Sequence, residues 1–424
     1  MPQLLKIVIY TVFSNSLVWY DYALYGKLIN YISNNFMPNS SDNVVIGSFI
    51  IFSIGFFFRP LGAILFGFLG DKYGRKLSLV ISTISITLPM LVLTLLPSYK
   101  EIGIYSLLTL LLVRILQGLS LGGEAGTALL LIENAPKKLK GLFGSLEVLC
   151  AIIGAVLCEL AIIFAKNIVS PEIFGSWGWR IPFALGFTIG IIGVIFRFLA
   201  GESPVFLEYK EKLKNKINSI SFKESLRLMV TKYRSRLLIA ISIDALEEVS
   251  IYIFFVFLGV FIEDILFNNE SLGIFNSMHF IFLIVLGAST LFFAYLSDIW
   301  CRKKIVLFAA ILSIFSSFLI FALVINGGWW SIMLANLLLV VVIGASLGPI
   351  NIMMTQLFDM DFKYLGFALS RNISSAIFGG LAPVISIGII KFSGINILAG
   401  LYLFIISIIT LIGLKFYAKY QDNL

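Results

Sequence analysis

The chain has 424 residues, of which 59% are hydrophobic and 13% charged, and its 31 lysines and arginines exceed its 23 acidic residues by eight. A soluble domain is about 25% charged, so these proportions exclude a soluble protein and indicate that lipid covers most of the surface. Twelve helices of ~20 residues would use a little over half of the chain, which leaves no room for a sizeable soluble catalytic domain.

Twelve apolar segments, bounded by charged residues, follow one another along the chain. Each is long enough to cross a bilayer as a helix. They cover 8–31, 44–70, 76–97, 102–133, 141–165, 181–200, 237–262, 275–297, 305–326, 329–350, 365–390 and 395–414. The first segment has no small-residue cleavage site, so we expect it to be a retained span.

One long polar segment, 201–236, separates six spans from six. It predicts an N-terminal half at 1–200, a cytoplasmic central loop at 201–236 and a C-terminal half at 237–424. With both termini inside, inner segments hold 22 of the 31 lysines and arginines and outer segments hold four. Cytoplasmic loops carry an excess of basic residues, so both termini are predicted to be cytoplasmic.

A short motif occurs at the end of the second span and again at the end of the eighth. Residues 69–76 read LGDKYGRK and residues 296–303 read LSDIWCRK, with Asp and Arg four apart both times. The offset is 227 residues. Duplicated halves related by an axis along the membrane normal would produce this repeat.

These features resemble the major facilitator superfamily. The twelve spans, the central loop and the pattern Gly67-x-x-x-Asp71-x-x-Gly74-Arg75-Lys76 carry the resemblance. Further stretches are similar to the metabolite:proton symporter family, which includes the proline/betaine transporters: RPLGA at 59–63, RxxQG at 114–118 with GGE at 122–124, WRIPF at 179–183 and ESPxF at 202–206. The resemblance implies an all-α membrane protein with twelve transmembrane helices in two pseudo-symmetric six-helix halves.

The chain departs from this family's pattern at a few positions. Val18 precedes Trp19-Tyr20-Asp21 where the family usually has a Glu, and Arg371-Asn372 stands where it usually has Tyr-Asn. One of two expected membrane acids is therefore absent.

The resemblance also implies that the two inner hairpins gate the carrier through ion pairs and helix-end contacts. Anchoring by positive charge would explain the cations but not the repeated Asp, so gating is the favoured interpretation. Arg371, in the eleventh span, either joins this network or extends to the inner surface. The candidate gating residues are Asp71, Gly74, Arg75, Lys76, Asp298, Arg302, Lys303 and Arg371.

Charged and polar residues within the spans are the candidate functional site. A charge at mid-bilayer costs about 2.5–3.5 kcal/mol on insertion scales, so each should face a water-filled path or a partner. Spans three, nine, ten and twelve have none and span six has only Arg197, so we expect every third helix to face lipid. The candidate substrate and proton pathway comprises Asp21, Arg59, Arg114, Gln117, Glu124, Glu147, Asp244, Glu247 and Glu248.

Span four places Arg114, Gln117 and Glu124 on one helix face at 100° per residue. This arrangement predicts either a relay along that face or fixed ion pairs to neighbouring helices. Glycines recur every four residues from Gly118 to Gly126, and we expect them to let another backbone approach closely.

Span seven carries Asp244, Glu247 and Glu248 on adjoining positions. Like charges so close cannot all stay ionised in a low dielectric, so at least one is expected to hold a proton. Alternatively the cluster is wetted from the cytoplasm or neutralised by Arg371. Glu147 is either a second titrating group or a partner for a nearby arginine.

Asp21 lies among Trp19, Tyr20 and Tyr22. These rings either cover a quaternary ammonium or iminium cation by cation–π contact, with Asp21 supplying charge, or simply pack. Two arginines, Arg59 and Arg114, are candidates to hold a substrate carboxylate.

The sequence therefore predicts a secondary transporter that imports a small polar metabolite, either a zwitterionic osmolyte such as proline or betaine or a small carboxylate, by proton symport and alternating access. Alternatives are a transport-inactive sensor that retains the fold, or an uncoupled facilitator. An enzyme is not expected, because three cysteines and the single His279 offer no His/Cys cluster and no metal site. The expected location is the bacterial inner membrane, with the proton as coupling ion, no cofactor, no nucleic acid and no obligate protein partner.

Overall fold

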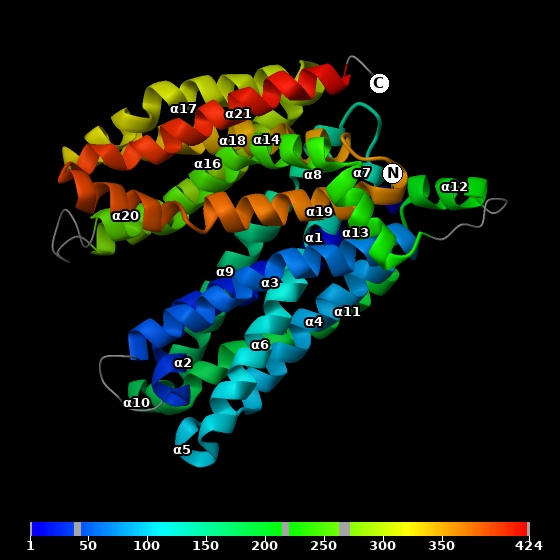
Figure 1. Ribbon diagram of the computed structural model, residues 1–424. Coiled ribbons are helices and arrows are strands. Elements are labelled where there is room, and N and C mark those ends of the chain that lie inside the picture. The colour runs from blue at the N-terminus through cyan, green and yellow to red at the C-terminus, as the bar shows by residue number, and fades with distance from the viewer. Residues whose placement is uncertain (1, 38–43, 214–219, 263–271, 422–424) are drawn as a thin grey trace. The chain divides into compact units, whose positions relative to one another are not determined.

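The computed structural model describes residues 2–37, 44–213, 220–262 and 272–421, and within these ranges the regular structure is helical (Figure 1). The chain divides into two compact units. Unit 1 holds Met1–Asn134, Glu147–Ile220 and Met360–Ala368, and unit 2 holds Ala135–Leu146, Ser221–Asp359 and Leu369–Leu424. Each unit thus takes one short segment from the other half of the chain.

The helices of unit 1 are α1 (Pro2–Lys27), α2 (Ile29–Phe36), α3 (Val44–Lys72), α4 (Arg75–Leu95), α5 (Tyr99–Ile102), α6 (Ile104–Gly122), α7 (Ala125–Asn134), α9 (Glu147–Ile168), α10 (Pro171–Ser176), the 3-10 turn η1 (Gly178–Arg180), α11 (Ile181–Leu199), α12 (Pro204–Leu213) and the 3-10 turn η4 (Met360–Phe362). Within this unit α3 packs on α6, and α1 packs on α9 and α11.

The helices of unit 2 are α8 (Lys140–Ser145), α13 (Phe222–Thr231), α14 (Arg234–Tyr252), the π-helix η2 (Ile253–Phe257), α15 (Leu258–Val260), α16 (Leu272–Ile299), α17 (Arg302–Ile325), α18 (Trp329–Thr355), α19 (Lys363–Ser374, which begins in unit 1), the π-helix η5 (Ser375–Gly379), α20 (Ala382–Ser393), the 3-10 turn η6 (Asn396–Ala399) and α21 (Gly400–Gln421). Within this unit α14 packs on α21 and α18 (Figure 1).

Ten helical segments among the described residues are long and apolar enough to cross a membrane. Two of the twelve predicted spans are not among these ten. They correspond to α1 and to α14 with its continuation through η2 and α15. Both carry buried charged residues, Asp21 in α1 and Asp244, Glu247 and Glu248 in α14. A membrane helix of this kind needs its polar face turned to protein or water. These two helices are therefore the ones expected to build an internal site.

Small residues bring α3 and α6 into backbone contact, which confirms the prediction for Gly118 and Gly122, whereas Gly126 in α7 makes room for the Tyr364 side chain. A Cβ on Gly118 would lie 2.2 Å from the carbonyl oxygen of Gly55, and one on Gly62 would lie 2.0 Å from that of Leu119. No side chain fits at such distances. Close approach through small residues is a general means of helix association in lipid, where hydrophobicity alone cannot drive it.

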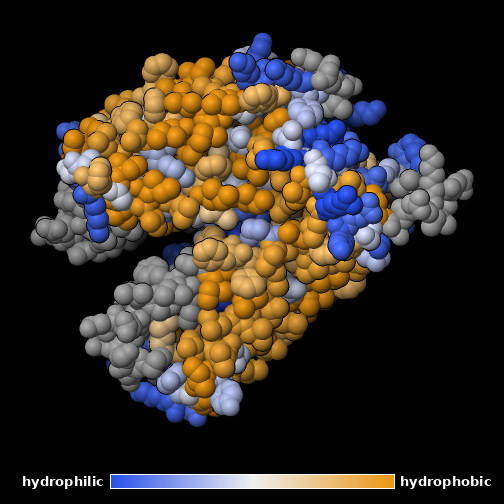
Figure 2. Space-filling view, viewed as in Figure 1, coloured by the Kyte–Doolittle hydropathy of each residue, from blue (hydrophilic) through white to orange (hydrophobic). Residues whose placement is uncertain are grey.

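The outer surface of each unit is apolar. Large hydrophobic side chains such as Phe57, Phe315 and Phe392 are more than three-quarters exposed. Figure 2 shows hydrophobic residues covering the sides of the helices, with hydrophilic residues gathered at their ends. This pattern fits helices whose sides contact lipid acyl chains and whose ends reach the polar headgroups.

Candidate functional site

Three side chains predicted from the sequence form one buried network in unit 1. Gln117 Nε2 donates to Asp21 Oδ1 at 2.8 Å, and Arg114 Nη1 donates to Gln117 Oε1 at 2.8 Å. All three are at most 2% exposed. Gln117 of α6 therefore links the Asp21 carboxylate on α1 to the Arg114 guanidinium, which lies one turn away on α6. We call these three residues the Gln117 network.

Neighbouring residues fix the arginine of this network. The Arg114 guanidinium lies over the Tyr25 ring, 3.9 Å from its centroid. A Cβ at Gly55 of α3 would come within 3.1 Å of Arg114 Nη2, so glycine makes room for the guanidinium. Cation–π contact stabilises a desolvated cation by about 2 kcal/mol.

Aromatic side chains connect α1 to α3 beside the Gln117 network. Trp19 and Tyr22 meet edge to face at 6.2 Å between centroids, Tyr22 meets Phe56 at 5.8 Å, and the Arg59 guanidinium lies 5.8 Å from the Phe56 centroid. These four residues are only partly buried. Tyr20 behaves differently from its neighbours: it is fully buried, and its hydroxyl donates to the Pro182 carbonyl at 2.5 Å.

A short interruption divides span four. Helix α6 ends at Gly122 and α7 starts at Ala125, so Glu124 lies at the junction. Its carboxylate accepts from Asn15 Nδ2 at 3.4 Å. The relay along this face stays a prediction.

Glu124 belongs to a second buried cluster that sequence reasoning missed. Thr127 Oγ1 donates to Asn15 Oδ1 at 2.8 Å, and Arg197 Nη2 donates to Thr127 Oγ1 at 2.9 Å and to Asn15 Oδ1 at 3.4 Å. Arg197 is 2% exposed, so this residue of span six faces the interior of unit 1. A lone arginine in an apolar span was the available signal. Glu147 is also buried, at the first residue of α9.

Unit 2 holds a third cluster, the acidic triad Asp244, Glu247 and Glu248 of α14. All three are at most 5% exposed, and their nearest carboxylate oxygens lie within 4.8 Å of one another. Arg371 Nη2 lies 3.5 Å from Glu247 Oε1, and Arg371 Nη1 donates to Asn351 Oδ1 at 2.6 Å. The structure therefore places Arg371 at the triad, where α19 presents it to α14 and α18. Its role in gating stays a prediction.

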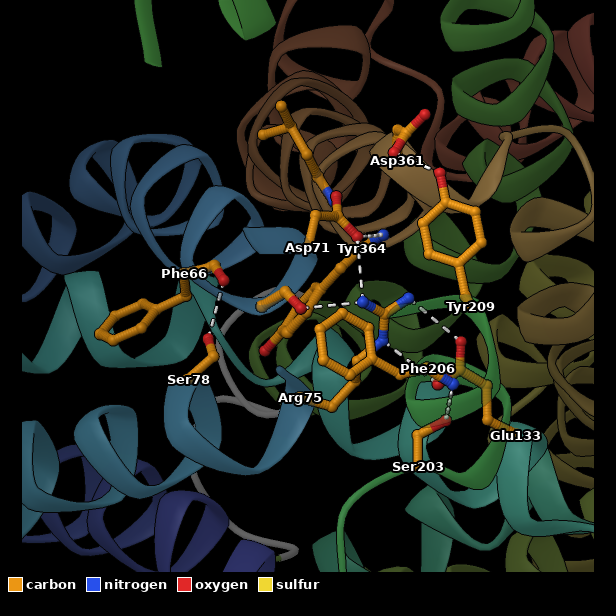
Figure 3. Close-up of polar contacts among 12 residues, drawn as sticks. Phe66, Asp71, Arg75, Ser78, Glu133, Ser203, Phe206, Tyr209, Asp361 and Tyr364 are labelled. Atoms are coloured by element: carbon orange, nitrogen blue, oxygen red, sulfur yellow. Dashed lines mark hydrogen bonds and ion pairs between the residues drawn. The ribbon is translucent and has the colours of Figure 1, made fainter. Parts of the chain in front are cut away.

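The first hairpin is organised around Arg75, which is fully buried (Figure 3). Its guanidinium lies 3.4 Å from Asp71, donates twice to Glu133 at 3.2 Å, and lies 4.8 Å from the Phe206 ring centroid. Glu133 and Phe206 were not predicted from the sequence. The bidentate geometry is the one that arginine favours with carboxylates.

Asp71 also reaches a helix N-terminus. Its two carboxylate oxygens accept the backbone N–H groups of Tyr364 and Leu365, both at 2.9 Å. These belong to the first turn of α19, where N–H groups have no partner within the helix and negative charge is favourable. This contact explains why residues 360–368 belong to unit 1.

Gly74 and Lys76 complete the first hairpin through their backbone. Gly74 has φ +116°, and a Cβ there would lie 2.2 Å from Glu202 Oε2. Glu202 accepts the N–H groups of Arg75 and Lys76 at the start of α4. Burial raises the pKa of the Glu202 carboxyl, opposed by these hydrogen bonds.

The second hairpin repeats the first. Asp298 pairs with Arg302 at 3.1 Å and accepts the N–H groups of Gly141 and Leu142, both at 2.8 Å, at the start of α8. Lys303 follows in the first turn of α17 and is partly exposed. The repeated Asp therefore caps a helix from the other half of the chain in both hairpins, which accounts for its recurrence.

A further ion pair lies within unit 2. Asp359 accepts from Tyr233 at 2.6 Å and from Arg236 at 3.0 Å. Although burial opposes ionisation, these two hydrogen bonds hold the pKa of Asp359 below its ordinary value.

Known transporters are similar to this chain over nearly its whole length. The family model described as "Sugar (and other) transporter" matches residues 7–418. The glycine betaine/proline/ectoine/pipecolic acid transporter OusA of Dickeya dadantii is 29% identical, covering 97% of this chain and 82% of its own. The proline/betaine transporter of Salmonella typhimurium is 30% identical, covering 94% of this chain and 80% of its own.

Solved structures give the same fold. The major facilitator superfamily proton:xylose symporter XylE of E. coli, bound to 6-bromo-6-deoxy-D-glucose, superposes with a TM-score of 0.76. The alignment covers 98% of this chain and 95% of that one at 17% sequence identity. At 17% identity the similarity shows a common fold only. This fold is the twelve-helix fold that the sequence predicts.

Proposed function

Because this chain belongs to the sugar (and other) transporter family of the major facilitator superfamily, we propose that it imports a small zwitterionic osmolyte, of the proline or betaine class, by proton symport. Membership makes it a multi-pass membrane transporter of a small molecule and not an enzyme. The observation that carries the substrate class is the Gln117 network, which holds an acid and a base in one buried site.

A zwitterion is complementary to this network. Its carboxylate matches the Arg114 guanidinium, and its cationic nitrogen matches the Asp21 carboxylate. Gln117 bridges the two charges with bonds of 2.8 Å on each side, which a substrate with opposite charges can replace without leaving either group unpaired. A dicarboxylate would satisfy Arg114 and be repelled by Asp21. The names of the two relatives support the zwitterionic class.

The partly buried aromatic residues beside the network suit a cation that cannot donate hydrogen bonds. A quaternary ammonium is held by ring faces and by a nearby negative charge. Three rings are available for this purpose. Trp19 and Tyr22 lie close to Asp21 in the sequence and contact each other, and Phe56 contacts Tyr22. Tyr20, which the sequence left as a candidate for this role, is fully buried, and its hydroxyl donates to the Pro182 carbonyl.

Proton coupling is proposed for the buried acids that lie outside the Gln117 network. Glu124 and the acidic triad are candidates, because a carboxyl group in a low dielectric readily takes up a proton. One proton moving through about 180 mV releases roughly 4 kcal/mol, enough for about thousandfold accumulation of a neutral solute. The two hairpins are proposed to gate access, since each Asp–helix contact must break if its helix is to move. We place both termini in the cytoplasm of a bacterial cell.

The test is uptake into proteoliposomes that contain the purified protein. Proline, glycine betaine and 2-oxoglutarate are supplied in turn, with and without an imposed pH gradient, inside acid or inside alkaline. We expect accumulation of proline or betaine only when the gradient drives protons inward with the solute. Accumulation of 2-oxoglutarate alone would overturn the substrate class. Uptake that ignores the gradient would indicate a facilitator, and absence of counterflow for every solute would indicate a sensor.

A further inference from the structure

An amide side chain bridges an acid and a base at a second place in unit 1. Asn15 Nδ2 of α1 donates to Glu124 Oε1 at 3.4 Å, and Asn15 Oδ1 accepts from Arg197 Nη2 of α11, also at 3.4 Å. All three residues are at most 6% exposed. This arrangement, here called the Asn15 bridge, has the same components as the Gln117 network, which is held by bonds of 2.8 Å. Hydrogen bonds weaken with length, so the Asn15 bridge is the looser of the two.

Arg197 is the residue that the Asn15 bridge leaves incompletely bonded. Its Nη2 atom also donates to Thr127 Oγ1 at 2.9 Å. Its Nε and Nη1 atoms are buried without a hydrogen-bond partner among the residues that the structure describes. A buried charged group with unmade hydrogen bonds is unfavourable, because the bonds it makes to water are lost on burial. Arg197 therefore has N–H donors that are available to a further acceptor.

Titratable groups from three places in unit 1 act on Arg197. Glu124 at the α6–α7 junction, Cys150 of α9 and Tyr364 at the start of α19 interact with it electrostatically. Glu147 of α9 in turn acts on Cys150. Thiols and phenols are largely neutral at pH 7, so the acids are the groups that can bring a full negative charge to this cluster.

Two observations select Glu124 as the acid that works with Arg197. It is a carboxylate that interacts electrostatically with Arg197, and it shares the Asn15 amide with it. The other acid of α7, Glu133, lies near the far end of that helix and is engaged with Arg75 at 3.2 Å. A nearby cation favours the ionised form of an acid, and protonation of the acid removes this attraction. The bonding of Arg197 is therefore linked to the charge of Glu124.

From these observations we infer that Arg197 is a positioning residue for proton coupling through Glu124. When Glu124 is ionised, its carboxylate accepts the N–H donors of Arg197 that the Asn15 bridge leaves unused. When a carboxylate oxygen of Glu124 binds a proton from water on the outer side, this ion pair is lost and the Asn15 bridge takes its place. Re-forming the pair returns the proton to water on the inner side. The inference rests on the proton symport proposed above, and it selects Glu124 from the candidate acids.

The first measurement is proton binding by the purified full-length protein in detergent, without transported solute. The infrared absorption of protonated carboxyl groups is recorded as a function of pH, and the difference between wild type and Glu124→Gln gives the titration of Glu124. The same difference is taken in the Arg197→Gln background. We expect Arg197→Gln to move the midpoint of this titration upward by about one pH unit or more, because a cation no longer favours the ionised acid.

Further variants separate this role from a merely structural one. Arg197→Lys keeps the charge and should bring the midpoint back toward that of wild type. Arg180→Gln is the matched control, since Arg180 is also a buried arginine of unit 1 and donates to the Leu96 carbonyl at 3.0 Å. Both glutamine variants should lower the unfolding temperature, but only Arg197→Gln should move the midpoint. If Arg197→Gln does not fold, Arg197→Met carries the same expectation, because methionine is unbranched and suits an apolar span.

Uptake into proteoliposomes tests the coupling itself. Glu124→Gln has no proton to release, so it should lose the accumulation of proline or betaine that an inward proton gradient drives. Counterflow of the same solute exchanges it without net proton movement, and this activity should still be measurable in Glu124→Gln.

Four outcomes would overturn the inference. They are no titration of Glu124 in folded wild-type protein, an unchanged midpoint in Arg197→Gln, an equal shift in Arg180→Gln, and accumulation by Glu124→Gln that matches wild type. An unchanged midpoint would mean that Arg197 is bonded by buried water alone. Failure of the proposed function is a different result, because wild-type protein would then accumulate neither proline nor betaine, whatever the infrared titration shows.

Discussion

Replacing Gln117 by leucine tests the network at its centre. The substitution keeps the size and helix propensity of the side chain but removes both 2.8 Å hydrogen bonds, one to Asp21 and one from Arg114. Hydrogen bonds to charged groups contribute about 1.5–3 kcal/mol each, so the loss amounts to roughly 3–6 kcal/mol. Asp21 and Arg114 would both remain buried, with their common partner removed.

The expected result is a lower unfolding temperature, because Asp21 and Arg114 stay buried after losing their common partner. The initial rate of proline or betaine uptake should change as well, because Gln117 no longer competes with the substrate for the two charged groups. Both are measured on the same proteoliposome and detergent preparations. Thr109→Val serves as the control, because that hydroxyl donates to the Tyr105 carbonyl within α6. Uptake within threefold of wild type, at an unchanged unfolding temperature, would refute the role assigned to Gln117.

Three further predictions follow from individual contacts. Arg114→Ala should abolish accumulation in proteoliposomes while membrane insertion stays intact, as judged by the amount of protein in the membrane fraction. Full uptake activity would remove the proposed carboxylate site. Gly62→Ala places a Cβ 2.0 Å from a carbonyl oxygen of α6, and it should lower the free energy of unfolding by about 1–3 kcal/mol or more. The measurement is the unfolding temperature, which should fall. In the control Gly388→Ala, the new Cβ meets nothing within 4 Å, so the unfolding temperature should stay unchanged. Asp359 has a pKa below its ordinary 3.8, so its stabilising effect is complete above pH 3.8 and is lost as the pH falls through the lower folded value. The difference in unfolding temperature between wild type and Asp359→Asn should therefore shrink below pH 3.8, and a constant difference would contradict the contact with Arg236.

The sequence alone was sufficient for the twelve spans, for the family and for the class of protein. The lipid environment restricts the sequence of a membrane helix, because every backbone polar group must be hydrogen-bonded within the helix and charged side chains are rare there. Asp21, Arg114 and the acidic triad stood out for that reason, and each is indeed buried. The repeated Asp71 and Asp298 were recognised from their spacing in the same way.

The partners of these groups could not be read from the chain. These contacts depend on which faces of different helices meet. They are Gln117 with Asp21, Glu124 with Asn15, and Arg371 with Glu247. Helical periodicity predicts neighbours within one helix, but rotation and crossing angle between helices are set by packing, here through glycines that permit backbone contact. The interruption after Gly122 is likewise a property of the packed unit.

The tertiary structure therefore decided which charges act together. Composition and hydropathy determine that a charge in a membrane helix requires a partner, because desolvation is costly wherever the charge lies. The identity of the partner depends on distances of a few ångströms between helices that are far apart in sequence, such as the 3.5 Å between Arg371 and Glu247. Electrostatic and hydrogen-bond energies change steeply over that range, so only the packed helices convert a set of buried charges into defined sites.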